Sequence, residues 1–246
     1  MTKVAFICLG AYNISSWNEH QNFDRQSVYS IALHQLLQLT EHSEIKERDL
    51  LLDLFVVENT IVDQKDIIPE MGKQFTHPRI QDVLFTNNND LGSKNKGAGE
   101  YFMCRAVINK HKDTLAHYDW IIYYTLRQII ISPLVLGAIS DIEQGILPKE
   151  TNIIVGNPDY LYLDGKRVQS APGNYCDMIF AMKPEQFFDY IESMSPEELI
   201  KKKMSSEMNL YDFVDSSTKK ESGIPLTLKR LGVMRHNYAI NTTEIV

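Results

Sequence analysis

Three apolar runs of strand length constrain the fold of this chain more than any other feature of its sequence. They are Val4 to Leu9, Leu50 to Val57 and Trp120 to Tyr124, and only Asp53 interrupts the second. Runs without alternation are typical of strands buried on both faces, as in the middle of a parallel sheet. The stretches between them carry helical signals. Apolar residues recur at helical spacing after Asp24 to about residue 42.

Two further helices are expected after this first one. One runs from about residue 98 to 116, and one starts where Ser132 precedes Pro133, because proline is well tolerated at the first helical position. Alternating strands and helices predict an α/β protein with a mostly parallel central sheet flanked by helices. Residues 58–82 are expected to form a long surface excursion, 83–86 a short strand and 87–92 a loop.

The later part of the chain adds antiparallel structure and helices. A short strand is expected at 152–155, and aromatic and β-branched residues around Asp164-Gly165 predict a hairpin over 160–168. Helices are predicted after Pro184, after the capping-box pattern that begins at Ser195, and over 225–231. We therefore expect a single domain, residues 1–246, with a sheet-containing core over 1–190 and a helical C-terminal tail over 191–246.

Composition excludes several classes of function. The net charge of −7 disfavours broad nucleic-acid binding but allows a small anionic ligand. The three cysteines form no CxxC pair, so reduced thiols are expected in place of a disulfide framework or zinc site. The N-terminus lacks a signal-peptide pattern, and no apolar stretch reaches membrane-spanning length, which predicts a cytoplasmic protein without a transmembrane segment.

Open α/β sheets bind ligands beyond the carboxyl ends of their strands, so the candidate site lies where the loops after Leu9, Val57, Thr86 and Tyr124 converge. Gly10 and Tyr12, which follow the first strand, are candidate substrate-binding residues. The chain contains neither GxGxxG after that strand nor GxxxxGK[ST], which disfavours a Rossmann dehydrogenase and a P-loop NTPase.

The segment Gly92 to Glu100 combines Lys94, Lys96 and three glycines directly before a helix. Backbone amides and lysine charge there are expected to bind phosphate, although the same composition also fits a solvated turn that caps the helix. Arg105, further along that helix, could point toward the same crevice or lie along the surface. Asp53 lies in an apolar strand, where a buried carboxylate is unfavourable unless it is paired or hydrogen-bonded. Its partner is either a structural side chain or a group of the candidate site.

The order of several segments resembles a group of bacterial and viral polysaccharide glycosyltransferases with a GT-A fold. The segments are VAFICLGAYN, LLDLFVVEN, NKGAGEYFMCRA, HYDWIIYYTLRQI and PGNYCDMIFAMKPEQFFDYI. In that group a Tyr-Asp, apolar strand, Arg-x-Asp element and a Gly-x-x-Asp element flank a nucleotide-sugar crevice. Tyr118, Asp119 and Arg127 match the first element, and Gly173 to Asp177 match the second.

The resemblance implies site residues and also shows one departure from the group. Ile129 stands where the group has an acid, and no Asp-x-Asp pair occurs in the chain. No cofactor is established by the sequence: the resemblance implies Mn²⁺ or Mg²⁺, but the missing acidic pair argues against that metal site. Binding of the diphosphate by Lys or Arg without metal is the alternative. The resemblance makes Asp177 the candidate catalytic base, although an aspartate that caps local backbone is the alternative. Asn174, in the same element, is a candidate substrate-binding residue.

The resulting hypothesis is a glycosyltransferase that moves a sugar from a nucleotide-sugar donor to a hydroxyl acceptor, expected to be a glycan. Tyr12, Tyr160 and Tyr162 could stack on base or sugar rings, or could simply pack across strands. The basic segment around Lys229, Arg230 and Arg235 could close over the nucleotide or finish the fold. A non-catalytic nucleotide-sugar-binding module and an unrelated nucleotidyltransferase are the alternatives.

Overall fold

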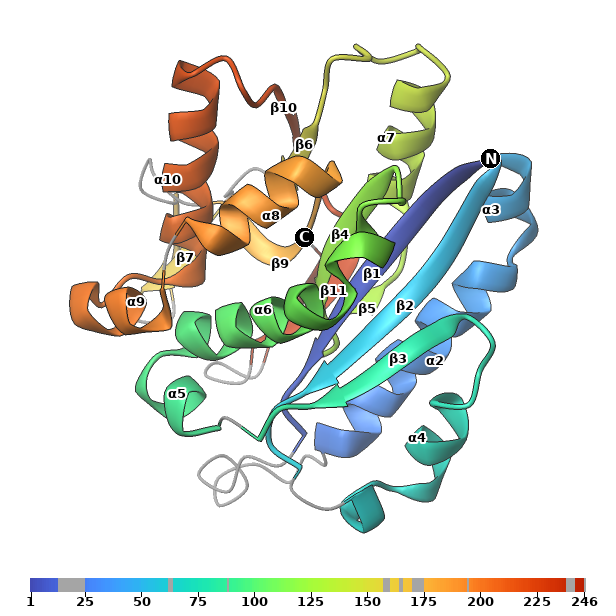
Figure 1. Ribbon diagram of the computed structural model, residues 1–246, viewed down its shortest axis with the longest axis vertical. Coiled ribbons are helices and arrows are strands. Elements are labelled where there is room, and N and C mark those ends of the chain that lie inside the picture. The colour runs from blue at the N-terminus through green and yellow to red at the C-terminus, as the bar shows by residue number, and fades with distance from the viewer. Residues whose placement is uncertain are drawn as a thin grey trace.

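A seven-stranded sheet forms the middle of the molecule (Figure 1). The structure is a computed structural model and describes residues 1–12, 25–61, 64–87, 89–156, 160–163, 166–169, 175–193, 195–237 and 242–245. In spatial order the strands are β10 (Pro225–Leu228), β6 (Ile153–Gly156), β9 (Cys176–Met182), β4 (Trp120–Thr125), β1 (Thr2–Gly10), β2 (Leu50–Glu58) and β3 (Ile80–Phe85). Only β9 runs antiparallel to its neighbours. The prediction of a mostly parallel sheet is therefore confirmed.

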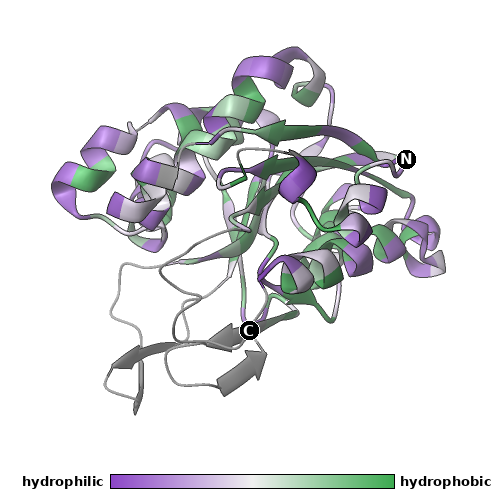
Figure 2. Ribbon diagram, turned by 90° about the horizontal axis from the view of Figure 1, so that it is seen from below, coloured by the Kyte–Doolittle hydropathy of each residue, from purple (hydrophilic) through white to green (hydrophobic). Residues whose placement is uncertain are grey.

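Helices cover both faces of this sheet. One face carries α2 (Arg25–Glu41), α3 (Ser43–Glu47), α4 (Pro69–Gln74) and α7 (Leu134–Glu143). The other carries α6 (Lys96–Leu115), α8 (Pro184–Glu192), α9 (Pro196–Lys202) and α10 (Ser206–Lys219), with α5 (Asn89–Lys94) packed on α6. Figure 2 shows the hydrophobic strands enclosed between helices whose hydrophilic residues lie largely outward.

The unbroken apolar runs follow from burial on both faces. In β1, Phe6 and Cys8 belong to the core beneath α2 and α7, whereas Ala5 and Ile7 belong to the core beneath α6 and α8. Successive side chains of a strand point to opposite faces, so each core needs every second residue to be apolar. Each large apolar side chain that is fully buried contributes about 1.5–3 kcal/mol to the stability of the fold. Side chains on both faces of the sheet contribute in this way.

Two smaller sheets complete the described part of the chain. The hairpin predicted over 160–168 is confirmed as an antiparallel pair, β7 (Tyr160–Leu163) and β8 (Lys166–Gln169), which forms its own two-stranded sheet. The second small sheet has the order β12-β11-β5, with bounds Thr242–Ile245, Val233–Asn237 and Ile129–Ile130.

The C-terminal tail differs from its prediction. Helices α9 and α10 are present, but the helix predicted over 225–231 is wrong, because β10 forms there and pairs with β6. Pro225 begins an edge strand, a position where the missing N–H is tolerated, and Leu226 and Leu228 alternate toward the core beneath α2 and α7. The sheet therefore extends beyond residue 190.

Two other local predictions also need correction. The loop expected over 87–92 is wrong from residue 89 onward, where α5 begins. The excursion over 58–82 contains a 3-10 turn (Gln64–Asp66) and α4, and β3 already starts at Ile80. None of the described helices combines the length and apolar character needed to cross a membrane.

Candidate functional site

The carboxyl edge of the parallel strands is where the candidate site was expected, and Asp177 lies at that edge. Strands β1, β2 and β4 end there, and the antiparallel strand β9 begins there. The Thr125 hydroxyl at the end of β4 donates to the Met178 carbonyl, 3.4 Å away, directly beside Asp177. The reversed direction of β9 therefore brings an aspartate from late in the chain to the ends of the early strands.

Asp177 is the centre of a group of polar side chains that we call the edge cluster: Lys96, Glu100, Arg127, Asp177 and Ser206. The Lys96 ammonium lies 3.0 Å from Asp177 Oδ2 and 3.3 Å from Glu100 Oε1. The Ser206 hydroxyl donates a hydrogen bond to the same Asp177 oxygen. Asp177 is 4% exposed, whereas the side chain of Lys96 is 42% exposed. Lysine is thus the group through which solvent reaches the aspartate.

Two helix starts place three members of the edge cluster. Asn95 caps α6 by accepting from the Ala98 amide at 3.0 Å, and Lys96 and Glu100 follow four residues apart on one helix face. Ser205 caps α10 by accepting from the Met208 amide at 3.2 Å, which leaves Ser206 at the first helical position. Capping thus orients Lys96 and Ser206 toward the same carboxylate.

Arg127 comes from the turn that follows β4. The Leu126 amide donates to Leu9 O at 3.0 Å, and the Gln128 amide donates to Thr125 O at 3.1 Å, so the turn is tied to the end of β1. The Nε of Arg127 is buried and has no hydrogen-bond partner among the described residues. A buried donor without an acceptor is unfavourable, which makes this nitrogen a candidate contact for an anionic ligand.

Mutual charge effects shift the pKa values of the edge cluster. Burial acts to raise the pKa of Asp177, but Lys96 and Arg127 outweigh burial and the net pKa lies well below the usual value. Burial and Arg127 lower the pKa of Lys96, yet the surrounding carboxylates raise it overall. For Glu100, burial dominates and the pKa is raised. Asp177 and Lys96 therefore form a charged pair at neutral pH.

Glu58 is a second buried carboxylate at this edge, and sequence reasoning did not single it out. It is fully buried at the end of β2 and accepts the Tyr12 and Thr60 amides at 2.9 Å each, as well as the Ile61 amide and the Thr60 hydroxyl. These bonds join the loop after β1 to the loop after β2. The available signal was an acidic residue directly after a strongly apolar run.

The glycine-rich segment is not the open phosphate loop that was predicted. It is divided between α5 and the first turn of α6, and Gly97 and Gly99 are buried. A β-carbon on Gly99 would lie 2.8 Å from Gly92 Cα, and one on Gly97 would lie 3.1 Å from the Ser206 amide nitrogen. These glycines allow α5 and α10 to approach α6 closely, so their role is packing.

Gly10 and Tyr12 also serve packing. Tyr12 is 2% exposed, and its ring meets that of Tyr29 edge-on with centroids 4.8 Å apart. A β-carbon on Gly10 would lie 2.6 Å from the Tyr12 ring, so the glycine makes room for it. A ring buried in this way offers no face to a base or sugar, which contradicts the stacking role predicted for Tyr12.

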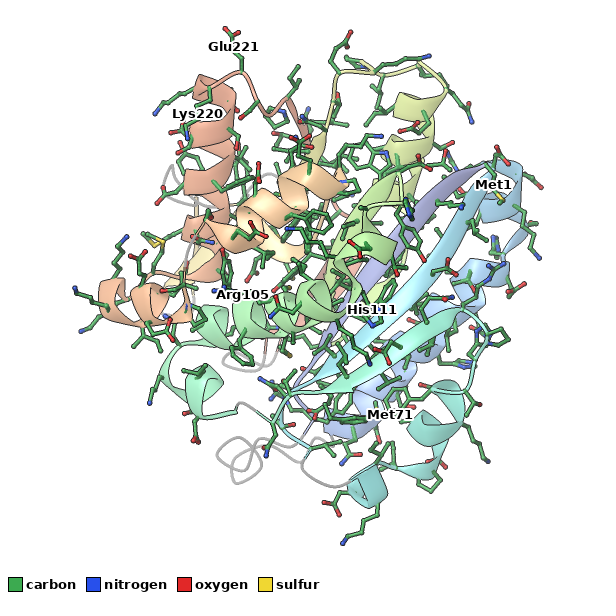
Figure 3. All side chains as sticks on the ribbon, viewed as in Figure 1. Met1, Met71, Arg105, His111, Lys220 and Glu221 are labelled. Atoms are coloured by element: carbon green, nitrogen blue, oxygen red, sulfur yellow. The ribbon has the colours of Figure 1, made fainter. Side chains whose placement is uncertain are left out.

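Of the other predicted binding residues, Lys94 and Arg105 lie away from Asp177, and Asn174 lies outside the described residues. Lys94 is exposed at the end of α5. Arg105 is exposed on α6 (Figure 3) and lies nine residues after Lys96, which at about 100° per residue places it on the opposite side of the helix. Asn174 lies outside the described residues, as do the side chains of Tyr160 and Tyr162. Their roles stay predictions.

Three acidic or aromatic candidates have structural partners away from this edge. Asp53 accepts the Tyr118 hydroxyl at 3.0 Å and the Gln81 amide at 3.2 Å, which confirms the structural alternative for it. Asp119 accepts the Lys3 amide at 2.7 Å where β1 and β4 begin. The Tyr118-Asp119 pair therefore lies at the opposite edge of the sheet from Arg127.

The basic segment after β10 lines a different cavity. Lys229 and Arg230 are exposed and border, with Arg48, a cavity of about 600 Å³ beside α7. This cavity lies on the face of the sheet that α2 and α7 cover, away from Lys96 and α6. The side chain of Arg235 lies outside the described part of the chain.

The carboxylates near the edge cluster are not arranged as a metal site. Among the described residues, no group of three or more His, Cys, Asp or Glu side chains is placed to hold a metal ion. Asp177 and Glu100 face Lys96, and Glu58 faces backbone amides. The residues present thus do not fit the divalent metal that the resemblance implies for its group.

Comparisons with known proteins bear on the fold. No protein-family model matches the sequence, and no curated protein matches it. A crystal structure described as a nucleotide-diphospho-sugar transferase, from Desulfovibrio desulfuricans G20, is similar with a TM-score of 0.50 and 14% identity, over 93% of this chain and 80% of that one. Mouse xyloside xylosyltransferase 1 in its apo form gives a TM-score of 0.46 and 12% identity, over 92% of this chain and 84% of that one.

The first of these similarities extends over most of both chains. Together with the strand order and the single antiparallel strand β9, it identifies the fold as GT-A-like, a mixed α/β fold with a mostly parallel central sheet. The predicted fold class is therefore confirmed. Fold by itself does not establish an activity, so the chemistry must be argued from the edge cluster.

Proposed function

We propose that this protein transfers a sugar from a nucleotide-sugar donor to the hydroxyl group of an acceptor, which we take to be a glycan. The proposal is supported by the GT-A-like fold and by a charged cluster at the sheet edge where open α/β proteins bind ligands. It also includes the finer prediction that the chain is related to polysaccharide glycosyltransferases of bacteria and viruses.

The observation that carries the proposal is the pair of cations at this edge. Lys96 is paired with Asp177 yet remains 42% exposed, and Arg127 has a buried Nε without a partner among the described residues. Sugar transfer releases a nucleoside diphosphate, on which negative charge develops in the transition state. Cations held in position before the reaction stabilise that charge, which is often the largest single contribution to catalysis.

The predicted role of Asp177 as catalytic base needs revision within this proposal. Its carboxylate is buried, accepts from Ser206 and is paired with Lys96, and its pKa is lowered. A general base works best when its pKa is near the working pH, so a carboxylate of low pKa is a weak base. We propose that Asp177 mainly holds the Lys96 ammonium at the leaving diphosphate. Its action as a base stays a prediction.

A non-catalytic module that binds nucleotide sugars is the second candidate function. The engagement of Asp177 favours it, because Asp177 Oδ2 is paired with Lys96 and Ser206, and Asp177 and Glu58 are only 4% and 0% exposed. Such a module would bind the donor through Lys96 and Arg127 without turning it over. Binding and turnover assays separate the two functions.

The decisive experiment is incubation of the protein with a panel of nucleotide sugars, with and without candidate glycan acceptors. We expect release of nucleoside diphosphate from one donor, measured by chromatography, and a rise in release when the acceptor is present. Lys96→Met should lower kcat by about 10- to 100-fold, since a hydrogen bond to a charged group is worth about 1.5–3 kcal/mol.

Lys112→Met is the matched control on the same helix. Lys112 is 53% exposed and pairs at the surface with Glu192, so its loss should leave release unchanged and stability within about 1 kcal/mol. Donor binding without turnover would support the non-catalytic module. The transferase proposal fails if no nucleotide sugar in the panel is bound or turned over.

A further inference from the structure

We propose that Lys96 and Arg127 bind the two phosphates of the donor directly, with no divalent metal ion between protein and diphosphate. This inference rests on the proposed function and specifies how the same site binds its ligand. It differs from the metal-assisted binding that the resemblance implies. The reason lies in the charges of the edge cluster.

The first step of the argument is that Asp177, the carboxylate at the centre of the edge cluster, is already paired with a cation. Glu100 Oε2 is buried without a partner among the described residues, and burial raises the pKa of Glu100, which weakens it as a metal ligand. Asp177 receives the Lys96 ammonium at 3.0 Å and the Ser206 hydroxyl, and Glu100 Oε1 lies 3.3 Å from the same ammonium. Magnesium and manganese prefer oxygen ligands that are free to coordinate. To coordinate a metal, Asp177 would have to release a charged hydrogen bond inside the protein.

The second step is electrostatic repulsion. Arg127 follows Thr125, whose hydroxyl donates to the Met178 carbonyl beside Asp177, and the charge of Arg127 helps to lower the pKa of Asp177. The same charge opposes the net rise in the pKa of Lys96. A divalent cation at Asp177 would therefore meet two resident positive charges in a partly buried environment, where charge interactions are stronger than in water. The Lys96 ammonium and the Arg127 guanidinium would instead attract the negative charge of a diphosphate.

The third step is the supply of hydrogen-bond donors. An ammonium has three N–H donors, and Asp177 and Glu100 account for two of those of Lys96. Arg127 has a buried Nε without a partner among the described residues. One ammonium donor of Lys96 and the Nε–H of Arg127 thus remain for phosphate oxygens, and planar guanidinium groups suit phosphates well.

The test is isothermal titration calorimetry of the wild-type protein with inorganic pyrophosphate and with UDP, GDP and ADP. Each titration is done in EDTA and again with Mg²⁺ or Mn²⁺. We expect pyrophosphate and at least one nucleoside diphosphate to bind in EDTA, with Kd changed less than about threefold by metal. Because binding depends on charge, Kd should also rise as salt is increased.

Two variants connect the binding to the named residues. Lys96→Met and Arg127→Met should each weaken pyrophosphate binding in EDTA by about 10- to 100-fold, as expected for loss of a charged hydrogen bond. Lys96→Arg keeps a positive charge beside Asp177, so this variant is expected to fold even if Lys96→Met does not. It should retain more of the affinity for pyrophosphate than Lys96→Met. Lys112→Met should bind as the wild type does.

Three outcomes would overturn the inference: binding that appears only with metal, binding strengthened more than tenfold by metal, and no binding of pyrophosphate under either condition. Failure of the proposed function is recognised separately. If pyrophosphate binds in EDTA and depends on Lys96, but no nucleotide sugar is bound or turned over, the phosphate site stands and the sugar-transfer proposal falls.

Discussion

Glu58 shows how one buried side chain can hold two loops of the site together. Its carboxylate accepts backbone amides from Tyr12, Thr60 and Ile61, which belong to the segments after β1 and β2. A carboxylate with several N–H donors is well compensated for its burial, whereas the same donors without an acceptor would each be destabilising. The fully buried Glu58 side chain therefore contributes to the shape of the carboxyl edge by joining these two segments.

We predict that Glu58→Gln destabilises the fold. The amide group would direct N–H groups at backbone N–H groups, and each amide left without an acceptor costs about 1–3 kcal/mol. Urea unfolding followed by circular dichroism measures the loss. The control is Asp215→Asn, which removes an exposed pair with Lys219 and should change stability by less than about 1 kcal/mol. Equal stability of the two variants would refute the role given to Glu58.

At the residue scale, the sequence predicted which residues belong to the edge cluster better than it predicted the contacts that they make. Asp177, Lys96 and Arg127 were all named from sequence, and they come together at one edge. Glu100 and Ser206 were not named, because their relevance depends on α6 and α10 meeting at β9. Tyr12 was assigned to ligand stacking because sequence alone does not show that its ring packs into the core beneath α2.

At the scale of elements, the start of α6 is the part that most depends on glycine. Gly97 and Gly99 lie in its first turn, where α5 and α10 come close. Glycine in a helix is normally unfavourable by about 1 kcal/mol relative to alanine. Here the lack of a side chain permits a contact that places Lys96 and Ser206 beside Asp177. The close packing of α5 and α10 on α6 therefore outweighs the low helix propensity of glycine at these two positions.

We predict opposite effects of alanine at two helical glycines. Gly99→Ala should destabilise the protein, because its β-carbon would lie 2.8 Å from the Gly92 backbone. Gly72→Ala in α4 should stabilise it by up to about 1 kcal/mol, because no atom lies within 4 Å of the added carbon and alanine favours the helix. Thermal unfolding of both variants provides the comparison. A stabilising Gly99→Ala would show that α5 is not packed on α6 as described.

At the scale of the whole molecule, one sheet separates two cores. The core beneath α2 and α7 includes Leu54, and the core beneath α6 and α8 includes Phe187. Both cores use alternate residues of the same strands, so neither can lose its packing without exposing strand residues to water. This arrangement favours one cooperative unit, and the single domain over residues 1–246 stays a prediction.

We predict that damage to either core shifts the same unfolding transition. Leu54→Ala and Phe187→Ala each remove a fully buried side chain, with an expected loss of about 2–5 kcal/mol. Circular dichroism and tryptophan fluorescence should then report one shared midpoint for each variant, lower than that of the wild type. Two separated transitions, with only one affected by each variant, would show that the two cores unfold independently.

The sequence determined on its own the features that depend on neighbours along the chain. Buried strands, capped helices and the hairpin over 160–168 follow from hydrophobic period and local hydrogen-bond preferences, which act over a few residues. The edge strand β10 lacked such a clear signal, because the proline at its start is as typical of helix N-termini as of edge strands.

Only the tertiary structure decided which residues that are distant in the sequence contact one another. The pairing of Lys96 with Asp177 joins positions 81 residues apart, and it requires β9 to run against β4 and α10 to begin beside it. Such contacts depend on the summed packing of the whole sheet and its helices, for which no local pattern in the chain is a guide. The same packing decided that the glycines before Tyr101 bring helices together.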